Sequence, residues 1–456
     1  MTYRADIDGL RAIAVVPVVA FHAGLPAVGG GYVGVDIFFV ISGYLITSII
    51  TSEIDAGAFS LATFYHRRVR RIFPALITVL LFCTMAGYLL MTPDDYKTLG
   101  QSIVATTLFL SNIFFWRQAN YFGAPASENP LLHTWSLAIE EQFYLFYPLL
   151  LLLVSKYIPT LRKSAILALC LLSFAASVWL LAVKPSATFY LGPTRFWELL
   201  VGGLIALSLI PASPNRSINL MASTLGTALI GYAVVFYSPA TRFPGVAALL
   251  PVLGAAAIIW SGTGVSTPVH RLIGAGPVAM LGKASYSLYL WHFPLIAFAS
   301  YVTLGGVSAP LMCAICLAAV LVSFASLHFI ERPFRLYARP AQVNRLLMAT
   351  AAAAMLAVFS GGLLVAIKNG FPSRIDAVAA RFLDAEHDKF LHPYECLSVD
   401  RQLCPLRRPA GSGAPASSRT LCYGATRIRW PRPWRWSNRR RRRDRRCFMR
   451  RLRTAR

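Results

Sequence analysis

The chain has 456 residues, of which 56% are hydrophobic and only 14% are charged. The mean hydropathy is +0.56, and apolar runs close to the length of a bilayer crossing recur along the chain. This composition excludes an ordinary water-soluble protein and predicts an integral membrane protein. Most of the formal net charge of +25 lies in residues 401–456, which contain 19 arginines, no lysine and one acid. The rest is typical of a membrane protein with basic cytoplasmic loops, so we expect the lipid bilayer as a partner and no nucleic acid.

Twelve apolar runs follow one another along the chain, and each predicts a helix. The first run has acidic and basic flanking residues and no clear cleavage site, so we expect an uncleaved helix and not a signal peptide. No internal repeat is visible, which counts against the inverted-repeat transporters. The runs are 9–25, 33–51, 72–91, 99–116, 136–155, 164–183, 194–210, 219–237, 244–262, 285–303, 309–330 and 346–367.

The basic connections between the runs predict the orientation, because cytoplasmic loops are enriched in Lys and Arg. Twelve spans cannot place all of these connections on one side. Eleven can, if the run at 99–116, which follows two acidic residues, is a re-entrant or interfacial helix on the outer side. We therefore predict an all-α, polytopic transmembrane helical bundle of about 11 spans. Its N-terminus is cytoplasmic, and everything after Phe371 is extracytoplasmic, including a short disordered tail.

Ionisable side chains within apolar runs are the first candidates for a functional site, because they are expensive to bury in a bilayer. In the first run, Arg11 and His22 lie about 16 Å apart along a helix and on nearly the same face. Asp36 lies at about the depth of His22, where a carboxylate can fix the tautomer of the imidazole and raise its basicity. Structural roles compete for each: topological charge for Arg11, an interfacial position for His22 and a helix-hairpin hydrogen bond for Asp36.

Two further groups of charges lie on later helices. Arg68 and Arg71, at spacing i, i+3, share a helix face that could bind a phosphate-rich donor, although topological charge is the competing interpretation. Glu140 and Glu141 are adjacent inside an apolar helix, which is difficult to explain structurally. Since adjacent residues project about 100° apart, we expect only one of them to face any given cavity.

Two more runs carry isolated polar groups. Arg195 and Glu198 form a possible i, i+3 ion pair that would neutralise itself. His292 is placed near the bilayer midplane, among aromatic residues that include Tyr286. Cys313 and Cys316 form a C-x-x-C pattern with no accompanying His or second Cys pair, so we expect no metal site.

Six sequence motifs occur in order along the chain. They are Asp8-Gly-Leu-Arg11 with His22, Gly34-Val-Asp-Ile-Phe-Phe-Val-Ile-Ser-Gly-Tyr44, Arg67-Arg-Val-Arg-Arg-Ile-Phe-Pro74, His133-Thr-Trp-Ser-Leu-Ala-Ile-Glu-Glu-Gln-Phe-Tyr144, Ser285-Tyr-Ser-Leu-Tyr-Leu-Trp-His-Phe-Pro294 and Glu331-Arg-Pro-Phe334. In this order the motifs resemble those of the acyltransferase-3 family, in the branch that carries a C-terminal extracytoplasmic SGNH-hydrolase-like domain and includes O-antigen acetyltransferases. The resemblance covers about residues 1–370.

The resemblance implies a multi-pass enzyme of the cell inner (plasma) membrane that transfers an acyl group to a sugar hydroxyl of an envelope glycan. The donor is cytoplasmic acyl-CoA, most often acetyl-CoA, and the acceptor is a periplasmic glycan or glycolipid such as lipopolysaccharide O-antigen. Arg11 and His22 match the family's Arg-x10-His pair, and Arg68 and Arg71 match its Arg-x-x-Arg motif. The residues that we assign from motifs and charges together are catalytic His22, Asp36, Glu140 and Glu141, donor-binding Arg11, Arg68 and Arg71, and substrate-binding His133, Trp135, Arg195, Glu198, Tyr286 and His292.

The expected domains are a membrane acyltransferase domain at 1–340, an additional transmembrane helix at 346–367, a periplasmic linker at 368–406 and an aberrant Arg-rich tail at 407–456. The family's SGNH domain should contain Gly-Asp-Ser-His, and this motif does not occur in the chain. We interpret the tail as a frame-shifted remnant of that domain, and an evolved basic tail is the competing interpretation. The alternatives to an active transferase are a truncated, inactive remnant of such an enzyme and a membrane transporter.

Overall fold

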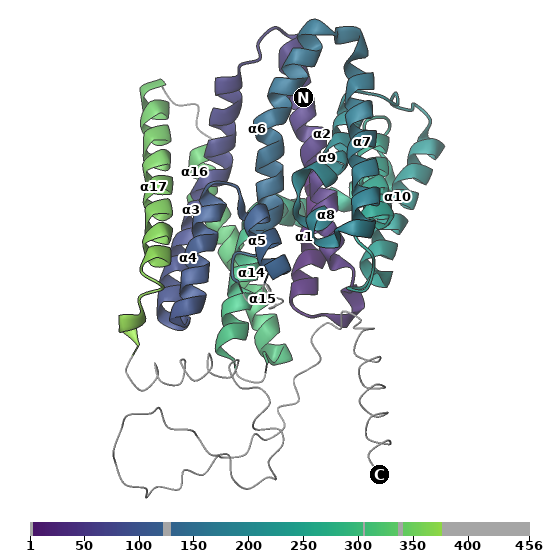
Figure 1. The fold of residues 1–456 in the computed structure, drawn as a ribbon. Helices are drawn as coiled ribbons and strands as arrows, with labels where there is room; N and C mark the ends of the chain where they lie inside the picture. The colour runs from purple at the N-terminus through teal and green to yellow at the C-terminus, as the bar shows by residue number, and fades with distance from the viewer. Residues whose placement is uncertain (1–2, 122–128, 304–305, 336–340, 376–456) are drawn as a thin grey trace, which may run out of the picture. The chain divides into compact units, whose positions relative to one another are not determined.

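The computed structural model describes residues 3–121, 129–303, 306–335 and 341–375, and the regular structure in these residues is helical, without a strand (Figure 1). Residues Met1–Gly370 form one compact unit, and Phe371–Arg456 form a second. The described part of the second unit holds one short 3-10 turn, Pro372–Arg374. The prediction of an all-α membrane bundle is confirmed. The predicted tail at 407–456 and residues 376–406 of the predicted linker lie outside the described residues.

The first half of the bundle begins with long helices that turn back on one another. Ser60 caps α3, because its side chain accepts a hydrogen bond from the backbone N–H of Thr63. Thr92 caps α4 in the same way through Asp95. The helices are α1 (Ala5–His22), α2 (Gly34–Asp55), α3 (Leu61–Leu90), α4 (Pro93–Thr107), α5 (Ser111–Tyr121), α6 (Thr134–Tyr157), α7 (Arg162–Val183), α8 (Pro185–Tyr190) and α9 (Phe196–Ala206).

The second half contains four long helices and several short ones, and one of the long helices ends in a π-helical turn. That turn, η7 (Ser326–Glu331), continues α15 and leads directly into α16. The remaining helices are α10 (Arg216–Phe236), α11 (Leu249–Ser261), α12 (Pro268–Ile273), α13 (Gly276–Lys283), α14 (Ser285–Val302), α15 (Ala309–Ala325), α16 (Arg332–Arg335) and α17 (Ala341–Ile367).

Each of the twelve apolar runs corresponds to helical structure, but the number of spans stays a prediction. By length and composition, seven helical segments in the described residues could cross a membrane, and two shorter apolar segments, Phe196–Ala206 and Gly245–Ser261, accompany them. The seven are Gly31–Asp55, Leu61–Leu90, Thr134–Tyr157, Pro159–Val183, Arg216–Phe236, Ala309–Phe334 and Leu346–Ile367.

The run at 99–116 is not one helix. It is divided between α4 and α5 by a turn in which Phe109 has a positive φ of 53°. The two helices have 15 and 11 residues, and neither is among the segments long and apolar enough to cross a membrane. This geometry agrees with a re-entrant or interfacial segment, while its side of the membrane stays a prediction.

The centre of the bundle is built on close helix contacts. Helix α2 packs extensively against α9 and also contacts α1, α6 and α11. A Cβ atom on Gly43 of α2 would collide with the backbone carbonyl of Leu199, and one on Gly202 of α9 would collide with that of Val40. Small residues at such crossings let two backbones approach closely inside a membrane. The contact fixes α2, which carries Asp36 and Ser42, against α9, which carries Glu198.

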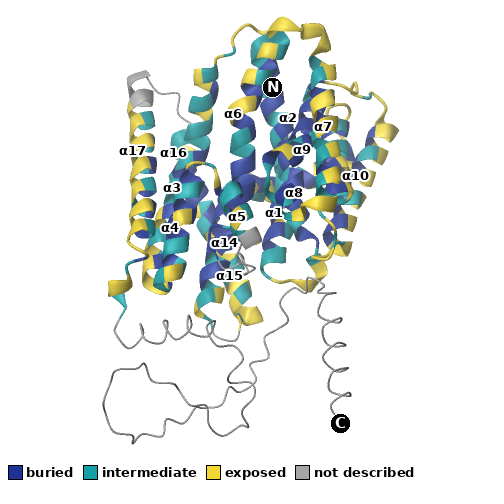
Figure 2. Ribbon diagram, in the orientation of Figure 1, coloured by how far each residue is buried: buried dark blue, intermediate teal, exposed yellow. Residues whose placement is uncertain are grey.

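Burial separates central helices from peripheral ones (Figure 2). In the apolar window of Gly31–Asp55, 72% of residues are buried, whereas in that of Pro159–Val183 only 17% are. The exposed large residues of α7 include Leu172 and Trp179, which are apolar. Such a surface is suited to lipid, so α7 lies at the periphery and α1, α2 and α14 supply the interior in which the polar residues are held.

Candidate active site

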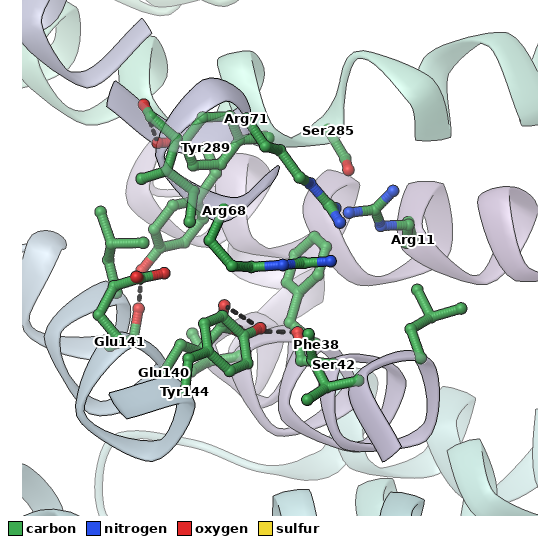
Figure 3. Close-up of a pocket in the computed structure, with 17 residues that line it drawn as sticks. Arg11, Phe38, Ser42, Arg68, Arg71, Glu140, Glu141, Tyr144, Ser285 and Tyr289 are labelled. Carbon is green, nitrogen blue, oxygen red and sulfur yellow. Dashed lines mark hydrogen bonds between the residues drawn. The ribbon is translucent and has the colours of Figure 1, made fainter. Parts of the chain in front are cut away.

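A pocket inside the bundle brings together residues from α1, α2, α3, α6 and α14 (Figure 3). Three of its lining residues are arginines and two are glutamates. Arg11, Arg68 and Arg71 all line it, so the shared helix face predicted for Arg68 and Arg71 is directed to this cavity, whereas His22 does not line it. Its 17 lining residues also include Phe38, Ser42, Glu140, Glu141, Tyr144, Ser285, Tyr286 and Tyr289.

The arginines give the pocket its positive character. The side chains of Arg11, Arg68 and Arg71 point toward one another in Figure 3. Arg11 lies 3.7 Å from the carboxylate of Asp8, whereas no ion pair within 4.0 Å involves Arg68 or Arg71 in the part of the chain that is described. The guanidinium of Arg68 packs over the rings of Phe64 and Tyr144 at 5.6 and 5.8 Å. Converging guanidinium groups of this kind are suited to bind phosphate or carboxylate oxygens.

Both glutamates line the pocket, so the expectation that only one would face a given cavity is wrong. A pocket that wraps around one side of α6 can contact two neighbouring residues. Glu140 accepts hydrogen bonds from the hydroxyl groups of Ser42 and Tyr144, each at 3.3 Å. The Oε1 atom of Glu141 is buried without a hydrogen-bond partner among the described residues, as is the Nε atom of Arg68. Buried polar atoms without partners often mark places where a ligand or water binds.

Tyr289 connects the pocket to a group of histidines. Its hydroxyl lies 2.7 Å from the backbone carbonyl of His133 and 2.6 Å from the hydroxyl of Ser136. Its ring lies 5.4 Å from that of His133 and 5.6 Å from that of His292, measured between centroids. The arginine pocket and the histidines are therefore neighbouring parts of one polar region.

The histidine cluster consists of His22, His133 and His292. The Nδ1 atom of His22, the last residue of α1, lies 3.1 Å from the Nε2 atom of His292 in α14. The rings of His133 and His292 are 5.7 Å apart between centroids. His133 and His292 are buried, while His22 is partly exposed. Three residues that the sequence separates by more than a hundred positions thus meet at one place.

Asp36 does not orient His22, and that expectation is corrected. Its Oδ1 atom accepts a hydrogen bond of 3.1 Å from the Nη2 atom of Arg195. Arg195 Nε also lies 3.2 Å from Glu198 Oε1, and all three side chains are fully buried. Asp36 pairs with Arg195 and not with His22, because a buried carboxylate is stabilised most by an opposite charge. The predicted ion pair between Arg195 and Glu198 is confirmed and includes a second carboxylate.

The residues predicted to bind substrate lie in different places. Tyr286 lines the pocket and donates a hydrogen bond of 2.9 Å to the carbonyl of Ile72. His133 and His292 belong to the histidine cluster. Arg195, Glu198 and Trp135 do not line the pocket: Trp135 is one of four aromatic residues whose rings pack around the Arg195 guanidinium at 5.5–5.8 Å, the others being Phe39, Phe189 and Phe243.

Five polar pocket residues were not singled out from the sequence: Ser42, Ser136, Tyr144, Ser285 and Tyr289. All five lie within the quoted motifs, and Tyr289 follows Tyr286 at spacing i, i+3, which places both on one helix face. That spacing was the available signal. Among the described residues, no group of three or more His, Cys, Asp or Glu side chains is arranged to hold a metal ion.

The fold and the site define a polytopic helical membrane protein with a basic pocket and a histidine cluster inside the bundle. The chain belongs to the acyltransferase-3 family, because the model of its acyltransferase domain matches residues 4–328. A peptidoglycan O-acetyltransferase of Listeria monocytogenes is 32% identical over 360 residues, which cover 73% of this chain and 56% of that protein. A Staphylococcus aureus protein provisionally named an O-acetyltransferase is 33% identical over 351 residues, covering 74% of this chain and 58% of its own length.

The chain therefore matches little more than half the length of these relatives. The part that the family model matches contains the pocket and the histidine cluster, since both lie within residues 4–328. No solved structure matches the chain.

Proposed function

We propose that the protein transfers an acyl group, acetyl from acetyl-CoA, across the inner membrane to a sugar hydroxyl of an envelope glycan. The observation that carries the proposal is the meeting of three arginines and two glutamates in one pocket inside the bundle. The same pocket adjoins three histidines through Tyr289. Membership of the acyltransferase-3 family and the names of the relatives support the same reaction class.

On the donor side, Arg11, Arg68 and Arg71 would bind the phosphates of the acyl-CoA. Guanidinium groups form paired, charge-assisted hydrogen bonds with phosphate oxygens. We assign this pocket to the cytoplasmic half of the bundle, where coenzyme A thioesters are available. The glutamates would lie beside the bound donor, where a carboxyl group can hold or release the proton that the departing thiolate takes up.

On the acceptor side, His22 would act as the general base. The hydroxyl oxygen of the sugar attacks the thioester carbonyl carbon, a C–O bond forms, and the C–S bond to coenzyme A breaks. The hydroxyl proton passes to His22, and the thiolate leaves as the coenzyme A product. A positioned base of this kind accelerates proton transfer by roughly 10²–10⁴-fold.

Two acceptors compete within this proposal. The motifs resemble those of O-antigen acetyltransferases, which favours lipopolysaccharide, whereas the Listeria monocytogenes relative is named for peptidoglycan. Mass spectrometry of both glycans from cells with and without the gene separates the two. Loss of acetyl groups from one glycan would identify the acceptor. Unchanged acetylation of both, with the protein present in the membrane at normal amounts, would contradict the transferase and favour an inactive protein.

A further inference from the structure

The two histidines that meet between α1 and α14 form a directed chain of hydrogen bonds. The Nδ1 atom of His292 lies 2.9 Å from the backbone carbonyl of Leu288, one turn earlier in α14. Its Nε2 atom lies 3.1 Å from Nδ1 of His22, and the two rings are inclined at 31°. This series of hydrogen bonds thus links the backbone carbonyl of Leu288, through His292, to His22.

The chemistry of these groups fixes the position of each proton. A carbonyl oxygen only accepts hydrogen bonds, so Nδ1 of His292 carries a proton. His292 is fully buried, and a charged imidazolium there would be costly. In the neutral ring Nε2 is therefore the acceptor, and Nδ1 of His22 must donate to it. Neutral His22 is left with its lone pair on Nε2.

We propose that His292 is a positioning residue that holds His22 in the tautomer whose Nε2 atom is free to accept a proton. The inference rests on the proposed function, since it concerns the nitrogen of His22 that would take the proton of the sugar hydroxyl. His292 thereby takes the role that the sequence assigned to Asp36, which was to fix the tautomer of His22. That carboxylate is bound to Arg195 and leaves the orientation of His22 to the neighbouring imidazole.

The surroundings of the pair agree with this arrangement. Phe293 packs edge-on against the ring of His22, with centroids 4.9 Å apart, and His133 packs edge-on against His292. The hydroxyl of Tyr289 is directed to the carbonyl of His133 and to Ser136. The neighbouring aromatic rings therefore hold the two imidazoles in place, while the short contact to His22 comes from His292.

The proposal is tested by ¹⁵N NMR of the full-length protein, labelled on histidine and reconstituted in lipid, at a pH where the buried histidines are neutral. The ¹⁵N shifts of the two ring nitrogens report which one carries the proton. His270 serves as an internal reference for the opposite tautomer: its Nδ1 accepts from the backbone N–H of Thr267, and its Nε2 lies 3.0 Å from the carbonyl of Ile258. Loss of a signal pair in His22→Ala assigns the resonances of His22.

We expect His22 to be protonated on Nδ1 in the wild type and to lose this preference in His292→Phe, with the signals of His270 unchanged. His292→Gln should retain it, because a glutamine amide oxygen can replace the Nε2 acceptor, whereas the shorter side chain of His292→Asn should not reach His22. Acyl transfer should fall about 10–100-fold in the Phe and Asn variants, as it does when the hydrogen-bond partner of a metal-binding histidine is removed, and less in the Gln variant.

A wild-type His22 protonated on Nε2 would overturn the proposal, as would an unchanged His22 tautomer in a folded His292→Phe variant. The NMR readout needs no turnover. An Nδ1-protonated His22 in a protein without acyl transfer would therefore contradict the proposed function and leave the pair geometry supported.

Discussion

His22 is the residue on which the proposed reaction depends most directly. We expect His22→Ala to reduce acyl transfer by about 10²–10⁴-fold, the usual contribution of a general base, without changing the amount of protein in the membrane. The measurement is the transfer of acetyl groups to a sugar acceptor by the purified protein in liposomes. His328→Ala is the matched control, because His328 is exposed and lies outside the pocket. Wild-type activity in His22→Ala would remove His22 from the mechanism.

The arginine pair of α3 provides a second test, directed at the donor. Replacing Arg68 and Arg71 together by Ala should raise the KM for acyl-CoA by about tenfold or more, since a hydrogen bond to a charged group contributes about 1.5–3 kcal/mol. Lys at both positions should recover only part of the loss, because an ammonium group cannot form the paired contacts of a guanidinium. The KM is measured by varying acetyl-CoA at a fixed concentration of sugar.

Arg67→Ala is the control for this series. Arg67 lies on the same helix but pairs with Glu53 at 2.7 Å and does not line the pocket. If the KM for acyl-CoA is equal in the double variant and in Arg67→Ala, Arg68 and Arg71 do not bind the donor and serve only as cytoplasmic charges that orient the helix.

At the level of single residues, the sequence predicted several of the residues that line the pocket, but only some of the partners of the buried charges. The cost of burying charge pointed to Arg11, Glu140 and Glu141, the i, i+3 spacing pointed to Arg68, and all of them line one pocket. Asp36 was assigned the wrong partner because depth along a helix does not fix the direction in which a side chain points. Arg195 immediately precedes α9 and lies 159 positions away, and no periodicity in the sequence indicates that contact.

Among the helices, the crossing of α2 and α9 is a contact that leaves no room for added volume. Gly43→Ala should lower the thermal unfolding temperature in detergent, because the new Cβ would collide with the carbonyl of Leu199. Overpacking of this kind costs about 1–3 kcal/mol. Gly231→Ala in α10 is the control, since no atom lies within 4 Å of a Cβ placed there and alanine favours a helix. Equal unfolding temperatures for the two variants would contradict the importance of the crossing.

The divided segment formed by α4 and α5 is tested by its side of the membrane. In a cysteine-free background, Gln118→Cys should react with an impermeant thiol reagent from the outer face. Ala240→Cys, in the loop before α11, is the reference for that face, and Ala58→Cys, between α2 and α3, is the reference for the cytoplasmic face. Reaction of Gln118→Cys together with Ala58→Cys would refute the eleven-span arrangement.

For the helices, apolar runs located the elements and positive charge ordered them, but neither fixed their ends. Helix α3 begins at Leu61, eleven residues before the run at 72–91, because its first turns are basic and hydropathy does not register them as helix. The apolar pattern likewise did not indicate that the turn at Phe109 interrupts the run at 99–116, since the residues of the turn are themselves apolar. Caps and turns depend on local hydrogen bonds, and hydropathy averaged over a window of residues does not detect them.

For the whole molecule, the region that matches the family and the C-terminal tail differ in sequence pattern and composition. Residues 4–328 carry five of the six motifs and match the acyltransferase domain, and their helices could be anticipated because a membrane requires every backbone group to be paired within a helix. Residues 407–456 have no hydrophobic period, and arginine occurs there without lysine. An evolved basic tail that binds anionic lipid would usually mix the two residues.

The last prediction is that this tail is read in a shifted frame. In a GC-rich gene, arginine codons arise readily out of frame, together with those of Trp and Pro. If the last base of each codon from Cys422 to Arg427 is joined to the first two bases of the next, permitted third bases spell Leu-Trp-Gly-Asp-Ser-His, which contains the motif expected of an SGNH domain. DNA sequencing decides the matter, and the idea fails unless the codons of Gly424, Ala425, Thr426 and Arg427 end in G, G, T and C. Restoring the frame should then yield a folded domain that carries this motif.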